Sequence, residues 1–149
     1  MSKNPLKLKV AYLYPDILKG YCDLANVETF VQRAKWRDID VQVQEIWAND
    51  KIQSQKYDFY YIGGSNLSSL DTAIEYLKQN EDDLIVASAS STPMLAVYCG
   101  YILFGTTYQL QNSAEVDGIN IFNISTKEHK KHYLYYKYLD FLFVSLQYE

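Results

Sequence analysis

The residues with the clearest potential for chemistry lie between positions 92 and 105. A short apolar run, residues 94–97, is followed by a Tyr98-Cys99-Gly100 corner and then by apolar residues at helical spacing. This pattern predicts a strand, a tight turn and a helix. Such a turn raises one side chain above the sheet, where neighbouring backbone N–H groups can stabilise an oxyanion. We expect Tyr98 or Cys99 at that position, and which of them lies there decides the chemistry.

Length, composition and charge limit the classes of protein to consider. The chain has 149 residues, 48% of them hydrophobic, which is enough for a single domain, 1–149, with its own core. A net charge of −4 provides no basic surface, so we expect neither nucleic-acid nor membrane binding. The apolar run 6–14 is too short for a spanning helix, and we expect a cytoplasmic protein. Cys22 and Cys99 lack disulfide or metal-ligand spacing, so we expect no metal or cofactor.

The order of hydrophobic patterns positions these residues. The expected elements are a strand at 6–14, a helix at 23–37, strands at 39–46 and 57–62, a helix at 71–80, the corner helix to about 108, and a strand at 116–124. Residues 82–90 fit either a strand or a buried helix. The alternation predicts a three-layer, flavodoxin-like α/β fold, with a mostly parallel sheet and helices on both faces. Gly63 and Gly64 follow a strand, so we expect them to line one cleft with the corner.

Three segments carry a resemblance to a known family. Residues 21–26 and 32–37 are similar to a Y-x-D-x-x-N…R-A-x-x-R opening, and residues 57–64 to a Y-D-I-x-F-I-G-G-G segment. Residues 93–105 are similar to P-G-L-x-I-C-G-G-Y-Q-x-L-G. The chain thereby resembles the class I glutamine amidotransferases of the cobyric-acid-synthase-like branch, over residues 6–135. The resemblance implies the fold above, glutamine hydrolysis, and, as in cell-wall amidation members, ammonia supply to a ligase-type partner.

The register of the corner decides whether that activity is expected. Aligned without a gap, Pro93 and Gly105 match the family's proline and final glycine, the nucleophile falls on Tyr98, and Cys99 takes the following glycine position. A one-residue deletion would instead bring Cys99 onto the nucleophile. Tyrosine cannot replace a thiolate, because a phenol with a pKa near 10 is a poor nucleophile at neutral pH. The gapless register therefore predicts a domain that does not hydrolyse glutamine.

The remaining family positions support the same expectation. The family's catalytic His lies in a Y-x-H-G segment expected beyond residue 149, so the resemblance implies a C-terminally shortened domain. His129 and His132 lie in a lysine-rich stretch, typical of a solvated turn, and the family's arginine falls on His132. The resemblance gives Asp23 and Asn26 a role in fixing the loop beside the cleft. The candidate cleft residues are Gly63, Gly64, Ser65, Tyr98, Cys99, Gly100 and His132.

Three functions follow from these patterns. The first is a catalytically silent amidotransferase-like module that binds a small amide ligand or a protein partner. The second is an active glutaminase subunit that uses Cys99. The third is a flavodoxin-like electron carrier, which is disfavoured because residues 14–17 lack a phosphate-binding loop. The aromatic stretch 133–148, expected to form two strands or a strand and a helix, predicts association with a partner or with a second copy.

Overall fold

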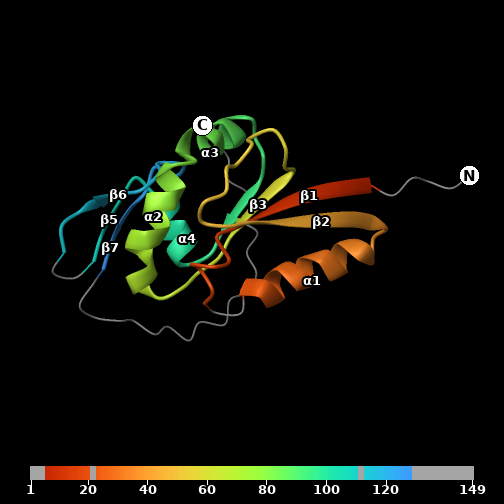
Figure 1. Ribbon diagram of the computed structural model, residues 1–149, viewed down its shortest axis with the longest axis horizontal. Coiled ribbons are helices and arrows are strands. Elements are labelled where there is room, and N and C mark those ends of the chain that lie inside the picture. The colour runs from red at the N-terminus through yellow and green to blue at the C-terminus, as the bar shows by residue number, and fades with distance from the viewer. Residues whose placement is uncertain (1–5, 21–22, 111–112, 129–149) are drawn as a thin grey trace, which may run out of the picture.

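The computed structural model describes residues 6–20, 23–110 and 113–128. Its centre is a parallel four-stranded sheet in the order β2-β1-β3-β4 (Figure 1). The strands are β1 (Leu6–Leu13), β2 (Ile39–Ile46), β3 (Phe59–Ile62) and β4 (Met94–Ala96). The helices are α1 (Asp23–Lys35), α2 (Leu70–Lys78), α3 (Glu81–Ala89) and α4 (Cys99–Phe104), with a 3-10 turn at Leu67–Ser69. Among these helices, none is long and apolar enough to cross a membrane.

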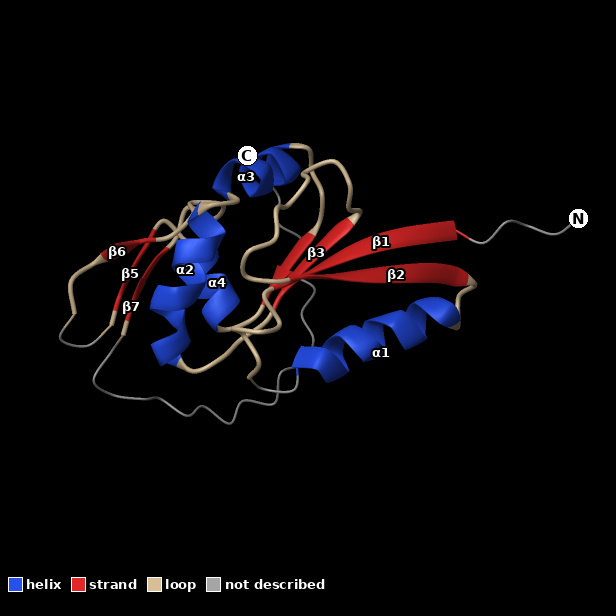
Figure 2. Cartoon of the chain, viewed as in Figure 1, coloured by secondary structure: helices blue, strands red, loops and turns tan. Residues whose placement is uncertain are grey.

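The two faces of this sheet carry separate apolar clusters. Side chains alternate between the faces along each strand, so Tyr12 of β1 and Tyr61 of β3 face α1 and pack with its Val27. Leu13 and Ile62 point to the opposite face, into a larger cluster with apolar residues of α2, α3 and α4. Figure 2 shows α1 on one side of the sheet and these three helices on the other. The predicted three-layer α/β fold with a mostly parallel sheet is confirmed.

Most of the expected elements are present, and the segment 82–90, for which the sequence allowed a strand or a helix, is helical. β1 lies between β2 and β3, and this interior position accounts for the burial of its second half, residues 10–13. Residues 82–90 belong to α3, where Leu84 and Ala87 are buried while Ile85 and Val86 are more than 40% exposed. The apolar run is therefore the partly exposed surface of a short helix rather than an interior strand.

The structure corrects the sequence prediction after the corner. α4 ends at Phe104 instead of continuing to about 108, and Thr107–Gln109 forms β5 of a second sheet, with the order β6-β5-β7. The expected strand 116–124 is wrong, since only β6 (Val116–Asp117) and the separate β7 (Ser125–Lys127) are strands. The chain between them turns back, and its amide groups at residues 119–122 donate to the carbonyl oxygens of residues 103–105. These bonds satisfy carbonyl groups that the end of α4 leaves unpaired.

Buried tyrosines make the fold sensitive to alkaline pH. Burial is the main cause that raises the pKa to about 12 at Tyr12, Tyr14, Tyr60 and Tyr108. In the unfolded chain these phenols titrate near pH 10. The folded state therefore holds more protons between these values, and stability present below pH ~10 is lost as the pH rises toward ~12.

We expect the urea midpoint of unfolding to fall steeply over that alkaline range and to change little just below it. Tyr108→Phe removes one of the phenols whose pKa is raised and should make the decline shallower. A midpoint that stays flat as the pH rises from ~9 to ~11.5 would contradict the raised phenol pKa values.

Candidate active-site elbow

Tyr98 occupies the sharp turn between β4 and α4. Its backbone angles are φ 46° and ψ −103°, a combination that non-glycine residues rarely adopt. The residue immediately after it is the first of α4, and the Tyr98 side chain is 47% exposed. Strain of this kind is typical of a nucleophile elbow, in which one side chain is raised above the sheet. The tyrosine, rather than the cysteine, thus has the strained backbone at the corner.

Cys99 lies one residue further on and points into the protein. Its exposed fraction is 0%, and its Sγ donates a hydrogen bond to the carbonyl oxygen of Ser65 at 2.8 Å. Burial raises the pKa of this thiol above its usual value. A buried, protonated thiol is chemically inert, because the thiolate is the nucleophile. In this position Cys99 packs the start of α4 against the loop after β3.

The loop that follows β3 lies against the elbow. The Gly100 amide donates to the Gly63 carbonyl oxygen at 3.2 Å, which connects the start of α4 to this loop. A Cβ atom built on Gly64 would lie 3.1 Å from the Cβ of Tyr98, so the two backbones approach closely. Ser65 is buried, and its hydroxyl is 3.2 Å from that of Ser69. The structure thereby brings together the glycine loop and the corner, which the sequence placed at the same sheet edge.

Asp23 of α1 holds this loop from the opposite side. Its side chain is 2% exposed, and its two carboxylate oxygens accept hydrogen bonds from the Gly64 amide at 2.8 Å and from the Tyr61 hydroxyl at 2.7 Å. Asn26 donates to the same hydroxyl at 3.2 Å. A Cβ atom on Gly63 would lie 2.5 Å from Asp23 Oδ2, so this contact requires glycine there. Asp23 therefore fixes the position of the loop beside the elbow.

Sequence reasoning missed two parts of this arrangement. The first is Tyr61, whose hydroxyl bonds to both Asp23 and Asn26. The sequence indicated this role only by placing a tyrosine in a buried strand, where its hydroxyl needs a hydrogen-bond partner. Gly20 donates its amide to the Gly64 carbonyl oxygen at 2.9 Å, which brings the loop after β1 to the same place. The candidates Cys22, His129 and His132, and the aromatic stretch 133–148, lie outside the described residues.

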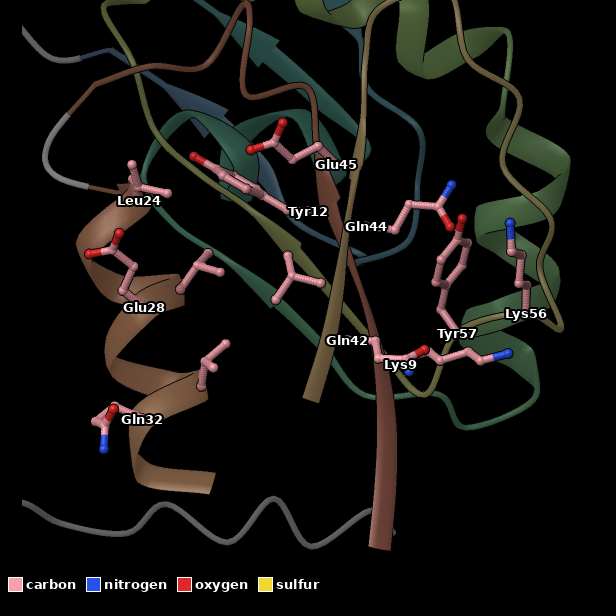
Figure 3. A pocket seen from close by; sticks show the side chains of 13 residues that line it. Lys9, Tyr12, Leu24, Glu28, Gln32, Gln42, Gln44, Glu45, Lys56 and Tyr57 are labelled. Atoms are coloured by element: carbon pink, nitrogen blue, oxygen red, sulfur yellow. The ribbon is translucent and has the colours of Figure 1, made fainter. Parts of the chain in front are cut away.

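A broad hollow formed by the described residues lies away from the elbow. It measures about 940 Å³ and surrounds the edge strand β2. Figure 3 shows its lining side chains on both sides of that strand, with Glu28 and Gln32 on α1 and with Lys56 and Tyr57 across the strand. Because alternate residues of a strand face opposite ways, these side chains border an open groove around the edge strand rather than an enclosed cavity. This hollow is therefore not an enclosed ligand-binding site.

The parallel sheet covered on both faces, with a strained strand-turn-helix corner at its carboxyl edge, is the arrangement of the class I amidotransferase type. Residues 9–140 match the profile of the CobB/CobQ-like glutamine amidotransferase domain, and the chain belongs to that family. It is 29% identical over 121 residues to the lipid II isoglutaminyl synthase (glutamine-hydrolyzing) subunit GatD of Staphylococcus aureus (strain N315). The match covers 81% of this chain, which spans about half, 50%, of the length of that relative.

A solved structure supports the fold independently. The structure of a peptidase E-type protein from Listeria monocytogenes EGD-e superimposes with a TM-score of 0.53, at 14% identity. The superposition covers 83% of this chain and 66% of that one. At this identity the similarity concerns the arrangement of strands and helices alone.

Proposed function

We propose that this chain is a glutamine amidotransferase-like domain that does not hydrolyse glutamine and that acts by binding. One observation carries the proposal. The strained corner, where the family has its nucleophilic cysteine, holds Tyr98, while the nearby thiol of Cys99 is buried against Ser65. Attack on a side-chain amide requires an accessible thiolate, and the elbow of this chain presents a phenol instead.

Hydrolysis through Cys99 is the competing function, and it would require the thiol to leave its present place. The Sγ atom would have to break its bond to Ser65 and reach the surface from a fully buried position at the start of α4. The backbone at Cys99 is already helical, so a side-chain rotation alone does not place it at the corner. The geometry therefore favours the silent domain.

A protein partner belongs to the same proposal. The relative from Staphylococcus aureus is named as a subunit of a synthase, which supports a ligase-type partner for this chain as well. A small amide ligand at the elbow and self-association through residues 133–148 are further expectations, as is a cytoplasmic location. Light scattering that showed a stable monomer at micromolar concentration would remove self-association.

Ammonia release from glutamine tests the proposal directly. We expect the native chain and a Tyr98→Phe variant to release ammonia at the same rate as a heat-denatured blank. Cys99→Ala should give the same result, because the buried thiol takes no part. Multiple turnovers by the native chain that disappear in Cys99→Ala would contradict the proposal and establish the glutaminase.

A further inference from the structure

The two edges of the parallel sheet differ in their protection against a further strand. β2 forms one edge and β4 forms the other. β2 exposes polar and charged side chains, those of Asp40, Gln42, Gln44 and Glu45. Residues 84–114, which include β4, contain no charged side chain. Charged side chains on an edge strand discourage pairing with another strand, so β4 is the edge that is open to pairing.

The backbone of β4 has amide groups that point away from the sheet. The Val97 amide donates to the Ile62 carbonyl oxygen at 3.0 Å, which directs the backbone of Val97 toward β3. Inward and outward groups alternate along an edge strand, so the amides of Met94 and Ala96 point outward. Both residues are partly buried, and no described strand lies beside them on that side. Since backbone amides away from water are nearly always paired, we expect a further strand along this edge.

The sequence contains a segment of suitable composition for this edge. Residues 133–148 lie outside the described residues, and Lys137 and Asp140 are their only charged side chains. The segment is rich in tyrosine, phenylalanine and leucine, and aromatic residues favour strands. The family profile matches residues 9–140, so the domain that contains the sheet continues into this segment. A segment of this composition gains by leaving water, and β4 offers it backbone partners.

The segment is long enough to reach β4 from the end of β7. β7 pairs with β5, β5 begins three residues after α4 ends, and α4 begins three residues after β4 ends. A path along β5 and the six residues of α4 therefore limits the distance from Lys127 to β4 to at most about 40 Å. About twelve extended residues span that distance. The second half of the stretch 133–148 can therefore lie beside β4.

We propose that a strand within residues 133–148 pairs with the free edge of β4 in the same molecule. The segment is tethered to the sheet, and a flexible tether gives an effective concentration near the millimolar range, above that of a second copy at micromolar concentration. Pairing within the molecule replaces the self-association otherwise expected of this stretch. It leaves the face of the sheet that carries Leu95 open to solvent, and it places the added strand beside the elbow. The inference does not depend on whether the elbow hydrolyses glutamine.

Hydrogen exchange of single amides in the full chain tests the pairing. The matched control is the amide of Val43 on β2, which points outward from the other edge, because the Ile46 carbonyl oxygen accepts from the Tyr14 amide of the loop after β1. We expect the amides of Met94 and Ala96 to exchange at least about tenfold more slowly than that of Val43, relative to their rates in unstructured peptides. Equal protection of the two edges would overturn the proposal.

Proline substitutions test whether the stretch 133–148 provides this protection. Tyr135→Pro and Phe143→Pro each remove a backbone donor and disfavour a paired strand at that position. At least one of them should accelerate the exchange of Met94 and Ala96 about tenfold or more. Lys130→Pro, a substitution of the same kind before the stretch, should leave it unchanged. The proposal fails if neither proline within the stretch has this effect, or if Lys130→Pro has it as well.

Dilution separates the chain's own segment from that of a second copy. Protection within one molecule is independent of protein concentration, whereas protection by a second copy falls as the dimer dissociates. We expect constant protection of Met94 and Ala96 on dilution, with light scattering that reports a monomer. Protection that disappears together with a dimer would show that a second copy occupies the edge of β4, and pairing within the molecule would be refuted.

Discussion

Replacing Tyr98 by cysteine is expected to create a thiol that reacts at least ~100-fold faster with iodoacetamide than Cys99 does in the native chain. Position 98 is 47% exposed at the elbow, whereas the Cys99 side chain is fully buried and its thiol pKa is raised by burial. Mass spectrometry of each labelled cysteine over time gives the two rates. A Cys22→Ser background removes the remaining cysteine, so that each signal has one source.

An exposed position of the neighbouring strand supplies the matched control. Leu95 of β4 is 48% exposed, and Leu95→Cys should react like an ordinary surface thiol. A chloroketone that mimics glutamine then separates accessibility from recognition. If the elbow retains its amide site, this reagent should label Tyr98→Cys faster than Leu95→Cys, while iodoacetamide labels both readily. Native Cys99 reacting as fast as Leu95→Cys would show that the thiol reaches the surface, and the assignment of a silent elbow would fail.

The elbow could be anticipated from the sequence because its parts are adjacent in the chain. A short apolar strand, a corner and an apolar helix follow one another within residues 92–105, and the alignment without a gap placed Tyr98 at the corner. The parallel sheet was equally accessible, since the second half of β1 and all of β3 are apolar and are followed by polar or glycine-rich residues. Such patterns can be predicted because they depend only on residues that are neighbours in the sequence.

The parts that were missed depend on contacts between distant residues. α4 ends at Phe104, where the backbone of Gly105 becomes extended, and the carbonyl groups left free there accept from the amide groups of residues 119–122. The contacts of buried Asn80 are a second example that the sequence pattern could not predict. Its side chain accepts from the Ile52 amide and donates to the Tyr14 hydroxyl and the Asp50 carbonyl oxygen, across separations of up to 66 residues. No periodicity in the sequence records such pairings, and only the folded arrangement reveals them.

The same reasoning gives Asp23 the largest effect expected on stability. Asp23→Ala leaves the Gly64 amide and the Tyr61 hydroxyl without their acceptor in a buried place. Each unsatisfied group costs about 1–3 kcal/mol, so we expect a loss of about 3 kcal/mol in the free energy of unfolding. Urea unfolding measures this loss, and hydrogen exchange of the Gly64 amide should accelerate by more than the global change requires, because the loop loses its local support.

Asp23→Asn separates the shape of the side chain from its charge. The amide oxygen can still accept from Gly64, but the amide nitrogen can only donate, so the Tyr61 O–H loses its acceptor while the Gly64 amide keeps its own. One unsatisfied group instead of two gives an expected loss of about 1–2 kcal/mol, smaller than that of Asp23→Ala. Glu28→Ala on the exposed face of α1 should change stability by less than about 0.5 kcal/mol. Combining Asp23→Ala with Tyr61→Phe should cost clearly less than the sum of the single changes, since the second removes a group that the first leaves unpaired. Equal losses for Asp23→Ala and Glu28→Ala would show that the carboxylate does not hold the loop, and the glycine loop would then owe its position to its backbone bonds with Gly20 and Gly100.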